Sequence, residues 1–289
     1  MNYKLFSDST CDLTPELADE LGIEIIPMQF SLNDKFYNHY LDGREMSHKD
    51  FYKALTEGAD VKTAQVQYET FAKYFEPTLK EGKDIIYICF TSGLSGTYNT
   101  SKIVVDELLE KYPDRKITVI DSLCASAGEG YLCYLAGLKY KEGYSFDDMC
   151  AYIEDIKLKI VHFFVVDDLD LLKKGGRIGT LSAAFGKALQ IKPLLSVDFE
   201  GKLVAVAKIR GNTKVYSTLF DRIIRDGENL SEQTIFVAHA DCPEKAEKLK
   251  EMISPYVKEV LTMQIGPIIG SHVGKGMCAM LCLGKRNLS

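Results

Sequence analysis

The sequence contains no apolar run near the ~20 residues that a membrane-spanning helix needs. Its first ten residues, MNYKLFSDST, lack the apolar centre of a signal peptide and lead directly into a strand-like pattern. Positive charge is not in excess, because 35 Lys and Arg stand against 41 Asp and Glu, a formal net charge of −6. Proteins that bind nucleic acid usually carry a basic surface, so we expect no nucleic-acid partner. These absences predict a soluble, cytoplasmic protein.

Metal-binding and disulfide patterns are also missing. The 8 Cys include no CxxC pair, and several lie inside apolar runs such as IYICF and MCAMLCLG. Without a secretory signal, we expect buried reduced thiols rather than disulfides. The 5 His are scattered, and none is spaced from a Cys or a carboxylate as in a zinc site. The sequence therefore predicts no metal and no cofactor.

The first half of the chain alternates strand and helix patterns. With 289 residues, of which 46% are apolar, the chain is long enough for a sizeable core and for two domains. Alternation of this kind predicts an α/β fold with a parallel sheet and helices on both faces. The expected strands are residues 3–6, 23–30, 85–90 and 117–120. The expected helices are residues 13–21, 47–56, 68–79, 98–111, 126–140 and 146–158.

The second half mixes hairpins with helices, which predicts a second, mixed α/β domain. Strands are expected at residues 162–166, 194–197, 203–209, 234–238, 259–265 and 277–283, and helices at residues 213–225 and 246–253. We place the boundary between residues 1–160 and 161–289. A cleft between two α/β domains commonly holds a small ligand.

The segment TSGLSGTY, residues 91–98, is the most informative motif. It follows a buried strand and precedes a helix, so backbone N–H groups of the first helical turn are free to bind an anion. Gly93 and Gly96 permit a tight turn, while Ser92, Ser95 and Thr97 offer hydroxyl groups. The alternative is a helix cap with spare serines. The turn lacks the Lys of a P-loop and the pattern GxGxxG, so a nucleotide is not the expected ligand.

Two further segments are candidates for the same site. In GPIIGSHVGKG, residues 266–276, His272 lies among four glycines between two apolar strands, which favours a flexible loop wrapped around a ligand. In VKTAQ, residues 61–65, Thr63 lies in an expected loop, where it either caps the next helix or binds a ligand.

Three other polar segments have both a functional and a structural interpretation. SDST, residues 7–10, ends a strand where α/β sheets bind ligands, but its neighbours could equally cap a helix. KKGGRIG, residues 173–179, could bind an anion or form a charged surface turn. IRGNTK, residues 209–214, places Arg210 and Lys214 one helical turn apart, as a basic face for an acidic partner or as a solvated surface.

The serine and the histidine of these candidate segments also allow a second interpretation, in which the protein is a hydrolase. Ser95 could act as the nucleophile and His272 as the base of a small acyl hydrolase. However, GLSGT lacks the spacing of the GxSxG elbow, and no acidic residue adjoins His272 in the sequence. This interpretation remains the alternative at the level of sequence.

These motifs together resemble the DegV family, in particular its fatty-acid-binding members that serve as the lipid-carrying subunit of bacterial fatty acid kinase. The resemblance covers essentially the whole chain. It rests on SDST with DLTPE, EIIPM, VKTAQ, FTSGLSGTYNT, VIDS, KKGGRIG, IKPLLS and GPIIGSHVGKG, in family order and spacing.

The resemblance implies a two-domain protein that buries one long-chain fatty acid and has no catalysis of its own. It implies that Thr63, Ser95 and His272 hold the carboxylate, and that Arg210 meets a separate ATP-dependent kinase. The acyl phosphate would then pass to phospholipid synthesis, with a membrane acyltransferase as a further partner. Ala64 and Val66 stand where relatives have Ser and Pro, so a looser carboxylate end is expected.

Overall fold

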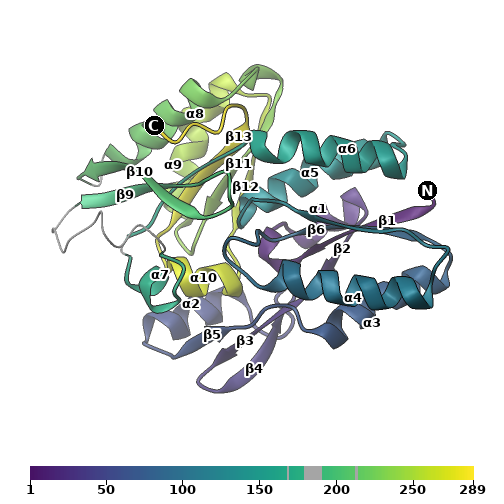
Figure 1. Cartoon of the computed structure of the whole chain (residues 1–289). Coiled ribbons are helices and arrows are strands. Elements are labelled where there is room, and N and C mark those ends of the chain that lie inside the picture. The colour runs from purple at the N-terminus through teal and green to yellow at the C-terminus, as the bar shows by residue number, and fades with distance from the viewer. Residues whose placement is uncertain (168, 179–190, 212–213) are drawn as a thin grey trace.

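A computed structural model describes residues 1–167, 169–178, 191–211 and 214–289 (Figure 1). Its first sheet has the strand order β2-β1-β6-β7, and every neighbouring pair is parallel. These strands are β1 (Tyr3–Asp8), β2 (Ile23–Ile26), β6 (Asp84–Cys89) and β7 (Ile117–Asp121). The parallel sheet predicted for the first half is therefore confirmed.

Helices cover both faces of this sheet, as predicted (Figure 1). On one face lie α3 (Tyr68–Lys80) and α4 (Thr97–Lys111), and on the other lie α1 (Pro15–Leu21), α5 (Ala127–Lys141) and α6 (Phe146–Ile156). Local sequence accounts for the start of several helices. The hydroxyl of Thr14 accepts from the backbone N–H of Leu17 at 3.2 Å, which caps α1 ahead of Pro15.

The second half forms a six-stranded mixed sheet with the order β10-β9-β8-β13-β11-β12. Only the pair β11–β12 is parallel. Two helices, α8 (Lys214–Asp226) and α9 (Pro243–Ile253), cover its outer face. The strands are β8 (Ile160–Val165), β9 (Ile191–Val197), β10 (Leu203–Arg210), β11 (Thr234–His239), β12 (Glu259–Gln264) and β13 (Cys278–Leu283).

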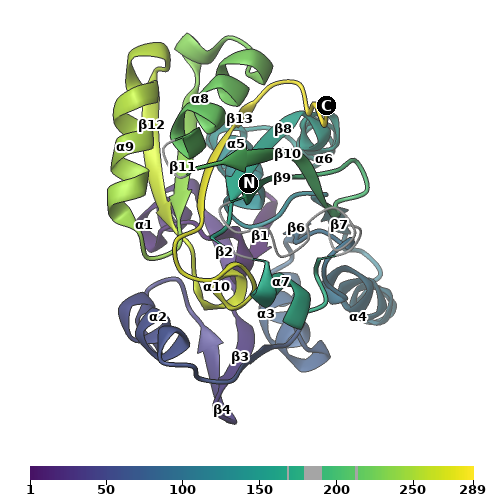
Figure 2. The ribbon, with the colours of Figure 1, turned by 90° about the vertical axis from the view of Figure 1, so that its left-hand side faces the viewer.

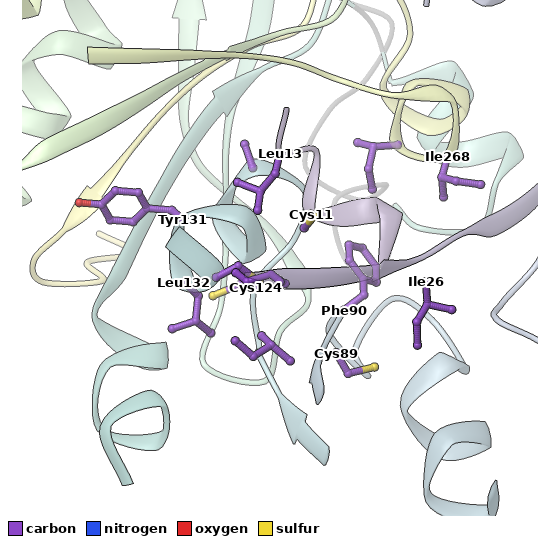
Figure 3. Packing of buried hydrophobic residues seen from close by; sticks show 14 of the residues in the cluster. Cys11, Leu13, Ile26, Cys89, Phe90, Cys124, Tyr131, Leu132 and Ile268 are labelled. Carbon is purple, nitrogen blue, oxygen red and sulfur yellow. The ribbon is translucent and has the colours of Figure 1, made fainter. Parts of the chain in front are cut away.

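Helix α5 lies between the two large sheets and joins their cores. It contacts β6 of the first sheet and β8, β11 and β13 of the second. Its Tyr131 is 1% exposed and donates to the carbonyl of Thr234 at 2.9 Å. Figure 3 shows Tyr131, Leu132, Cys11 and Phe90, which belong to one apolar cluster. The two halves therefore share one hydrophobic core, and the division at residue 160 stays a prediction.

The prediction of a single strand at residues 23–30 was wrong. The chain breaks at Pro27, which has no N–H to donate to a ladder, and it continues in a different sheet. This small antiparallel sheet has the order β4-β3-β5 and consists of β3 (Met28–Leu32), β4 (Lys35–His39) and β5 (Val61–Thr63). Strand β5 replaces the loop expected around Thr63.

The small sheet and α2 (His48–Thr56) support a helix that the sequence did not predict. Residues 266–276 were expected to form a flexible segment between two strands, but α10 (Pro267–Val273) occupies most of them, with Pro267 in its first turn. Helix α10 contacts α2, β3, β5 and α7 (Asp170–Lys174). Figure 2 shows α10 between the large mixed sheet and the elements α2 and β3. Segments from both halves therefore meet at α10.

Four short 3₁₀ turns complete the described elements: Ser9–Cys11, Lys157–Lys159, Leu230–Glu232 and Ser254–Tyr256. Gly179 of KKGGRIG and Asn212 and Thr213 of IRGNTK lie outside the described residues. All eight cysteines are described and unpaired, and seven of them are buried. No helix within the described ranges has the length and apolar character needed to cross a membrane; the cytoplasmic location stays a prediction.

Candidate functional site

A largely apolar cavity lies where the two halves and the small sheet meet. Its lining is mostly apolar with a few polar side chains, as is usual for a site that binds a small organic ligand. The ends of β1, β5 and β6, the start of α5, the inner face of β8 and β13, and α10 all contribute to its wall. Large apolar lining side chains include Met28, Phe90, Phe164, Leu203, Ile269 and Leu281.

Thr63 and His272 meet at this cavity. Thr63 ends β5, His272 lies near the end of α10, and Thr63 Oγ1 is 2.9 Å from His272 Nε2. Both residues are half-buried and line the cavity. The contact of α10 with β3 and β5 brings together two residues that are 209 positions apart in the chain.

Ser95 lines the same cavity from the turn between β6 and α4. Its Oγ lies 2.9 Å from Thr97 Oγ1 and accepts from the backbone N–H of Thr97 at 3.2 Å. Thr97 Oγ1 in turn accepts from the backbone N–H of Val66 at 3.3 Å, next to the Thr63 loop. The structure thus places the three predicted carboxylate ligands, Thr63, Ser95 and His272, on one cavity.

The other predicted residues of this turn do not line the cavity. Ser92 is exposed, and its backbone N–H donates to Asp121 at 3.1 Å. A Cβ atom at Gly93 would lie 2.6 Å from the carbonyl oxygen of Gly201, and one at Gly96 would lie 2.1 Å from Gln65 Oε1. These glycines permit close packing of the turn against neighbouring loops.

Arg177 is the site residue that sequence reasoning did not select. It lies in KKGGRIG, lines the cavity and donates from Nε to the carbonyl of Leu94 at 3.2 Å. Its Nη1 donates to the carbonyl of Gly175 at 2.5 Å. The motif was noted as a possible anion site, but Lys173 and Lys174 are exposed while Arg177 is half-buried. One fixed cation is therefore placed beside Ser95 and His272.

Gly175 of the same motif packs against His272. A Cβ atom at Gly175 would lie 2.3 Å from His272 Nδ1, closer than any side-chain carbon tolerates. His272 Nδ1 is buried and has no hydrogen-bond partner among the described residues. Burial, and secondarily the charge of Arg177, lower the pKa of His272 to about 4. The imidazole is therefore neutral near pH 7 and can act as a hydrogen-bond donor or acceptor, but not as a cation.

The described contacts do not form the charge relay of a serine hydrolase. His272 bonds Thr63 rather than Ser95, and within the described residues its other nitrogen meets no carboxylate. Ser95 is engaged with Thr97. The arrangement fits hydrogen bonding to a bound carboxylate better than attack on an ester.

The SDST segment has a structural role. Asp8 is buried at the end of β1 and accepts from the Tyr87 hydroxyl at 2.7 Å and from the backbone N–H of Phe90 at 3.2 Å. Ser9 Oγ accepts from the backbone N–H of Met28 at 2.9 Å. These bonds tie β1 to β6 and to the small sheet, while only Thr10 of the four residues lines the cavity.

Asp12 holds α10 against the start of α5. It accepts from the backbone N–H of Gly266 at 2.8 Å and from the Ser126 hydroxyl at 2.6 Å. Complete burial nevertheless raises the pKa of Asp12 to about 7. The native state therefore binds a proton more tightly at this carboxyl than the unfolded chain does.

We expect Asp12→Asn to change the pH dependence of stability. With an unfolded pKa of about 3.9, wild-type Asp12 lowers the free energy of unfolding by up to ~1.4 kcal/mol per pH unit as pH rises from about 4 to 7. Asn does not titrate, so the stability of the variant relative to wild type should rise across this window. Urea unfolding at several pH values measures the difference, with surface Asp106→Asn on α4 as control. A difference that is constant with pH would contradict the assignment.

Fold and cavity together define an α/β protein with a largely apolar cavity where its two halves meet. The chain belongs to the DegV family, a family of uncharacterised proteins whose model matches residues 2–285. A DegV domain-containing protein of Clostridium perfringens is 42% identical over 284 residues, which cover 98% of this chain and 97% of the relative. One from Streptococcus pyogenes is 32% identical, covering 99% of this chain and 100% of the relative.

Solved structures share the fold. A fatty-acid-binding DegV family protein from Thermus thermophilus has a TM-score of 0.89 and 27% identity, covering 98% of this chain and all of its own. DegV from Bacillus subtilis, described as a fatty acid binding protein, has a TM-score of 0.86 and 26% identity, covering 99% and 100%. A stearic acid-binding protein from Eubacterium ventriosum has a TM-score of 0.86 and 25% identity, covering 98% of both chains.

Proposed function

We propose that this protein binds one long-chain fatty acid, with its tail in the apolar cavity and its carboxylate at Thr63, Ser95 and His272. The observation that carries the proposal is the segregation of the lining. Apolar side chains make up most of the wall, while Thr63, His272, Ser95 and Arg177 converge from four separate segments. Fatty acid binding by structural relatives supports it.

The tail supplies most of the affinity in this scheme. Each buried methylene contributes ~0.8 kcal/mol, so about fifteen contribute roughly 12 kcal/mol before the costs of association. A hydrogen bond to a charged group contributes only about 1.5–3 kcal/mol. The polar residues therefore orient the ligand, and Arg177 offsets the negative charge of a carboxylate or a phosphate at the same point.

We further propose that the protein presents the bound acid as a substrate to a separate ATP-dependent kinase. The protein itself does not phosphorylate the acid. Acyl phosphate formed in this way would pass to phospholipid synthesis, with a membrane acyltransferase as the acceptor. Arg210 ends β10 and is exposed, as a residue that meets a partner must be. It does not line the cavity, so ligand and partner contacts are separable.

The test compares variants of this protein at the proposed carboxylate site with a variant at the proposed kinase contact. Thr63→Ala and Ser95→Ala each remove one hydroxyl from the carboxylate end, and we expect the double variant to lower acyl phosphate formation by at least tenfold at saturating kinase. Arg210→Ala should leave fatty acid affinity unchanged and raise the kinase concentration needed for half-maximal rate. A fluorescent fatty acid displacement assay and a kinase titration measure both quantities.

Unchanged phosphorylation in the double variant would remove Thr63 and Ser95 from the site. Loss of lipid binding in Arg210→Ala, with normal binding in the double variant, would place the pocket elsewhere. Each single variant changes one small polar group at a turn or strand end, where lost hydrogen bonds cost ~1 kcal/mol of stability. Melting temperatures of the variants report that cost separately from binding.

A further inference from the structure

Arg286 is a buried cation in the segment that follows β13. It is 6% exposed, and none of its hydrogen-bond partners within the described ranges is a carboxylate, although buried charges are usually paired. All five N–H groups of its guanidinium are nevertheless used. One donates to the sulfur of Cys124 at 3.3 Å. The others donate at 2.8–3.0 Å to the backbone carbonyls of Leu123, Lys157, Ile160 and Asp198.

These partners come from three segments that are far apart in the sequence. They are the turn between β7 and α5, the 3₁₀ turn that leads into β8, and the turn between β9 and β10. Each segment adjoins residues that line the cavity, such as Ser126, Phe164 and Val197. Arg286 itself is not a lining residue, so it acts from behind the cavity wall.

The guanidinium lies where β8 and β9 separate. The two strands are paired only over residues 164–165 and 194–195, so the start of β8 and the end of β9 share no ladder hydrogen bonds. The carbonyls of Ile160 and Asp198 instead both accept from Arg286, at 3.0 Å each. One side chain therefore fixes the β9–β10 turn against β8 at the point where the sheet does not.

The β9–β10 turn, residues 198–202, contacts the turn that carries Ser95. The carbonyl of Gly201 accepts from the Thr91 hydroxyl at 3.0 Å, and the carbonyl of Thr91 accepts from the backbone N–H of Ser95 at 3.3 Å. Gly201 has φ 74°, and a Cβ atom there would lie 1.8 Å from Thr91 Oγ1, so only glycine allows this approach. A displacement of the β9–β10 turn would therefore reach Ser95.

The β7–α5 turn makes a second connection to the Ser95 turn. Asp121, the last residue of β7, accepts through Oδ1 from the backbone N–H groups of Ser92 at 3.1 Å and Leu123 at 3.2 Å. Leu123 has φ 49°, a left-handed conformation that a leucine adopts only where its surroundings hold it. Its carbonyl accepts from Arg286 at 2.9 Å. Both turns that border the Ser95 turn are thus bonded to the same guanidinium.

We propose that Arg286 is a positioning residue of the fatty acid site, which holds Ser95 at the carboxylate by fixing the β7–α5 and β9–β10 turns. The inference rests on the fatty acid function proposed above. Without the guanidinium, buried carbonyls in both turns lose their donor and the turns must shift to find another. Lining residues such as Met28, Phe90 and Ile269 belong to elements that Arg286 does not bond, so the loss should fall on the carboxylate end.

The test begins with Arg286→Lys, which keeps the charge but places all its donors on one atom, so that it cannot reach three segments at once. Dissociation constants for stearic acid and for octadecanol are measured on delipidated protein by displacement of a fluorescent fatty acid. The variant should bind the acid about tenfold more weakly and the alcohol nearly as tightly as wild type, since only the acid needs the carboxylate site.

A double-mutant cycle separates positioning from a general loss of stability. In a Ser95→Ala background, Arg286→Lys should weaken acid binding less than twofold, because the hydroxyl that it positions is already absent. Arg115→Lys is the matched control. Arg115 also donates to a backbone carbonyl, that of Gly82, but it lies away from the cavity lining, so this variant should retain acid affinity.

The two proposals fail in different ways. If wild type binds stearic acid but Arg286→Lys keeps full affinity, weakens acid and alcohol equally, or weakens the acid as much in the Ser95→Ala background, Arg286 does not position the site and the fatty acid function stands. If wild type binds no stearic acid, both proposals are wrong. Should Arg286→Lys not fold, Thr91→Val removes the bond to Gly201 instead, and an unchanged ratio of acid to alcohol affinity in that variant would overturn the inference.

Discussion

Removal of the proposed fatty acid ligand should lower the melting temperature by about 10 °C. A ligand present at 1,000 times its dissociation constant stabilises the native state by about 4 kcal/mol, and in a chain of this size each kcal/mol shifts the melting temperature by about 2–4 °C. The effect should be this large because the empty cavity leaves facing apolar walls without a packing partner. Differential scanning calorimetry before and after organic extraction measures it, and mass spectrometry of the extract identifies the lipid.

Saturated acids of increasing length provide the internal control. Added back to the delipidated protein, they should restore the melting temperature progressively, since each buried methylene contributes ~0.8 kcal/mol, until the chain fills the cavity. Octanoic acid should therefore restore far less than stearic acid. An extract without fatty acid, together with a melting temperature that no added acid changes, would exclude fatty acid as the ligand.

Most of the first sheet could be predicted because its signals are local. Strand and helix periods alternate cleanly, and caps such as Ser47, which accepts from the backbone N–H of Asp50 at 3.1 Å, mark helix starts within a few residues. The break at Pro27 was missed because the apolar pattern continues through it. Only the register of β3 with β4 and β5 shows that the chain has changed sheets.

Helix α10 was hidden by Gly270 and by the glycines that flank it, because glycine normally disfavours a helix. Its seven residues are too few to be stable alone, and contacts with α2, β3, β5 and α7 hold them in place. Gly266 followed by Pro267 was the available signal, since proline favours the first helical position. Glycine at 270 then lets the Tyr52 hydroxyl approach, where a Cβ atom would lie 2.6 Å from it.

The site itself combines residues whose proximity no local pattern reveals. Thr63, Ser95 and His272 were selected through the family resemblance, and the structure brings them to one cavity. Arg177 was not selected because three cations share KKGGRIG, and only tertiary packing shows which of them turns inward. His162, which also lines the cavity, gave no sequence signal, because it lies inside the apolar run of β8.

Gly175→Ala should weaken fatty acid binding by at least tenfold. Gly175 itself does not touch the ligand in the proposed site. Gly175 has φ −75° and ψ −7°, which alanine adopts without strain. The new methyl group would overlap His272 Nδ1, so the imidazole must move and lose its 2.9 Å contact with Thr63. Misplacing a hydrogen bond to a charged group costs about 1.5–3 kcal/mol, which is tenfold or more in affinity.

Gly176→Ala is the matched control for this variant. Gly176 has φ +71° and open space around its missing Cβ, so alanine there strains the backbone by about 1 kcal/mol but leaves His272 in place. Its melting temperature should fall while fatty acid affinity is retained. A fatty alcohol of equal length lacks the carboxylate, and its affinity should be nearly equal in wild type and Gly175→Ala. If Gly175→Ala binds the acid as tightly as wild type does, the position of His272 does not determine how the carboxylate is held.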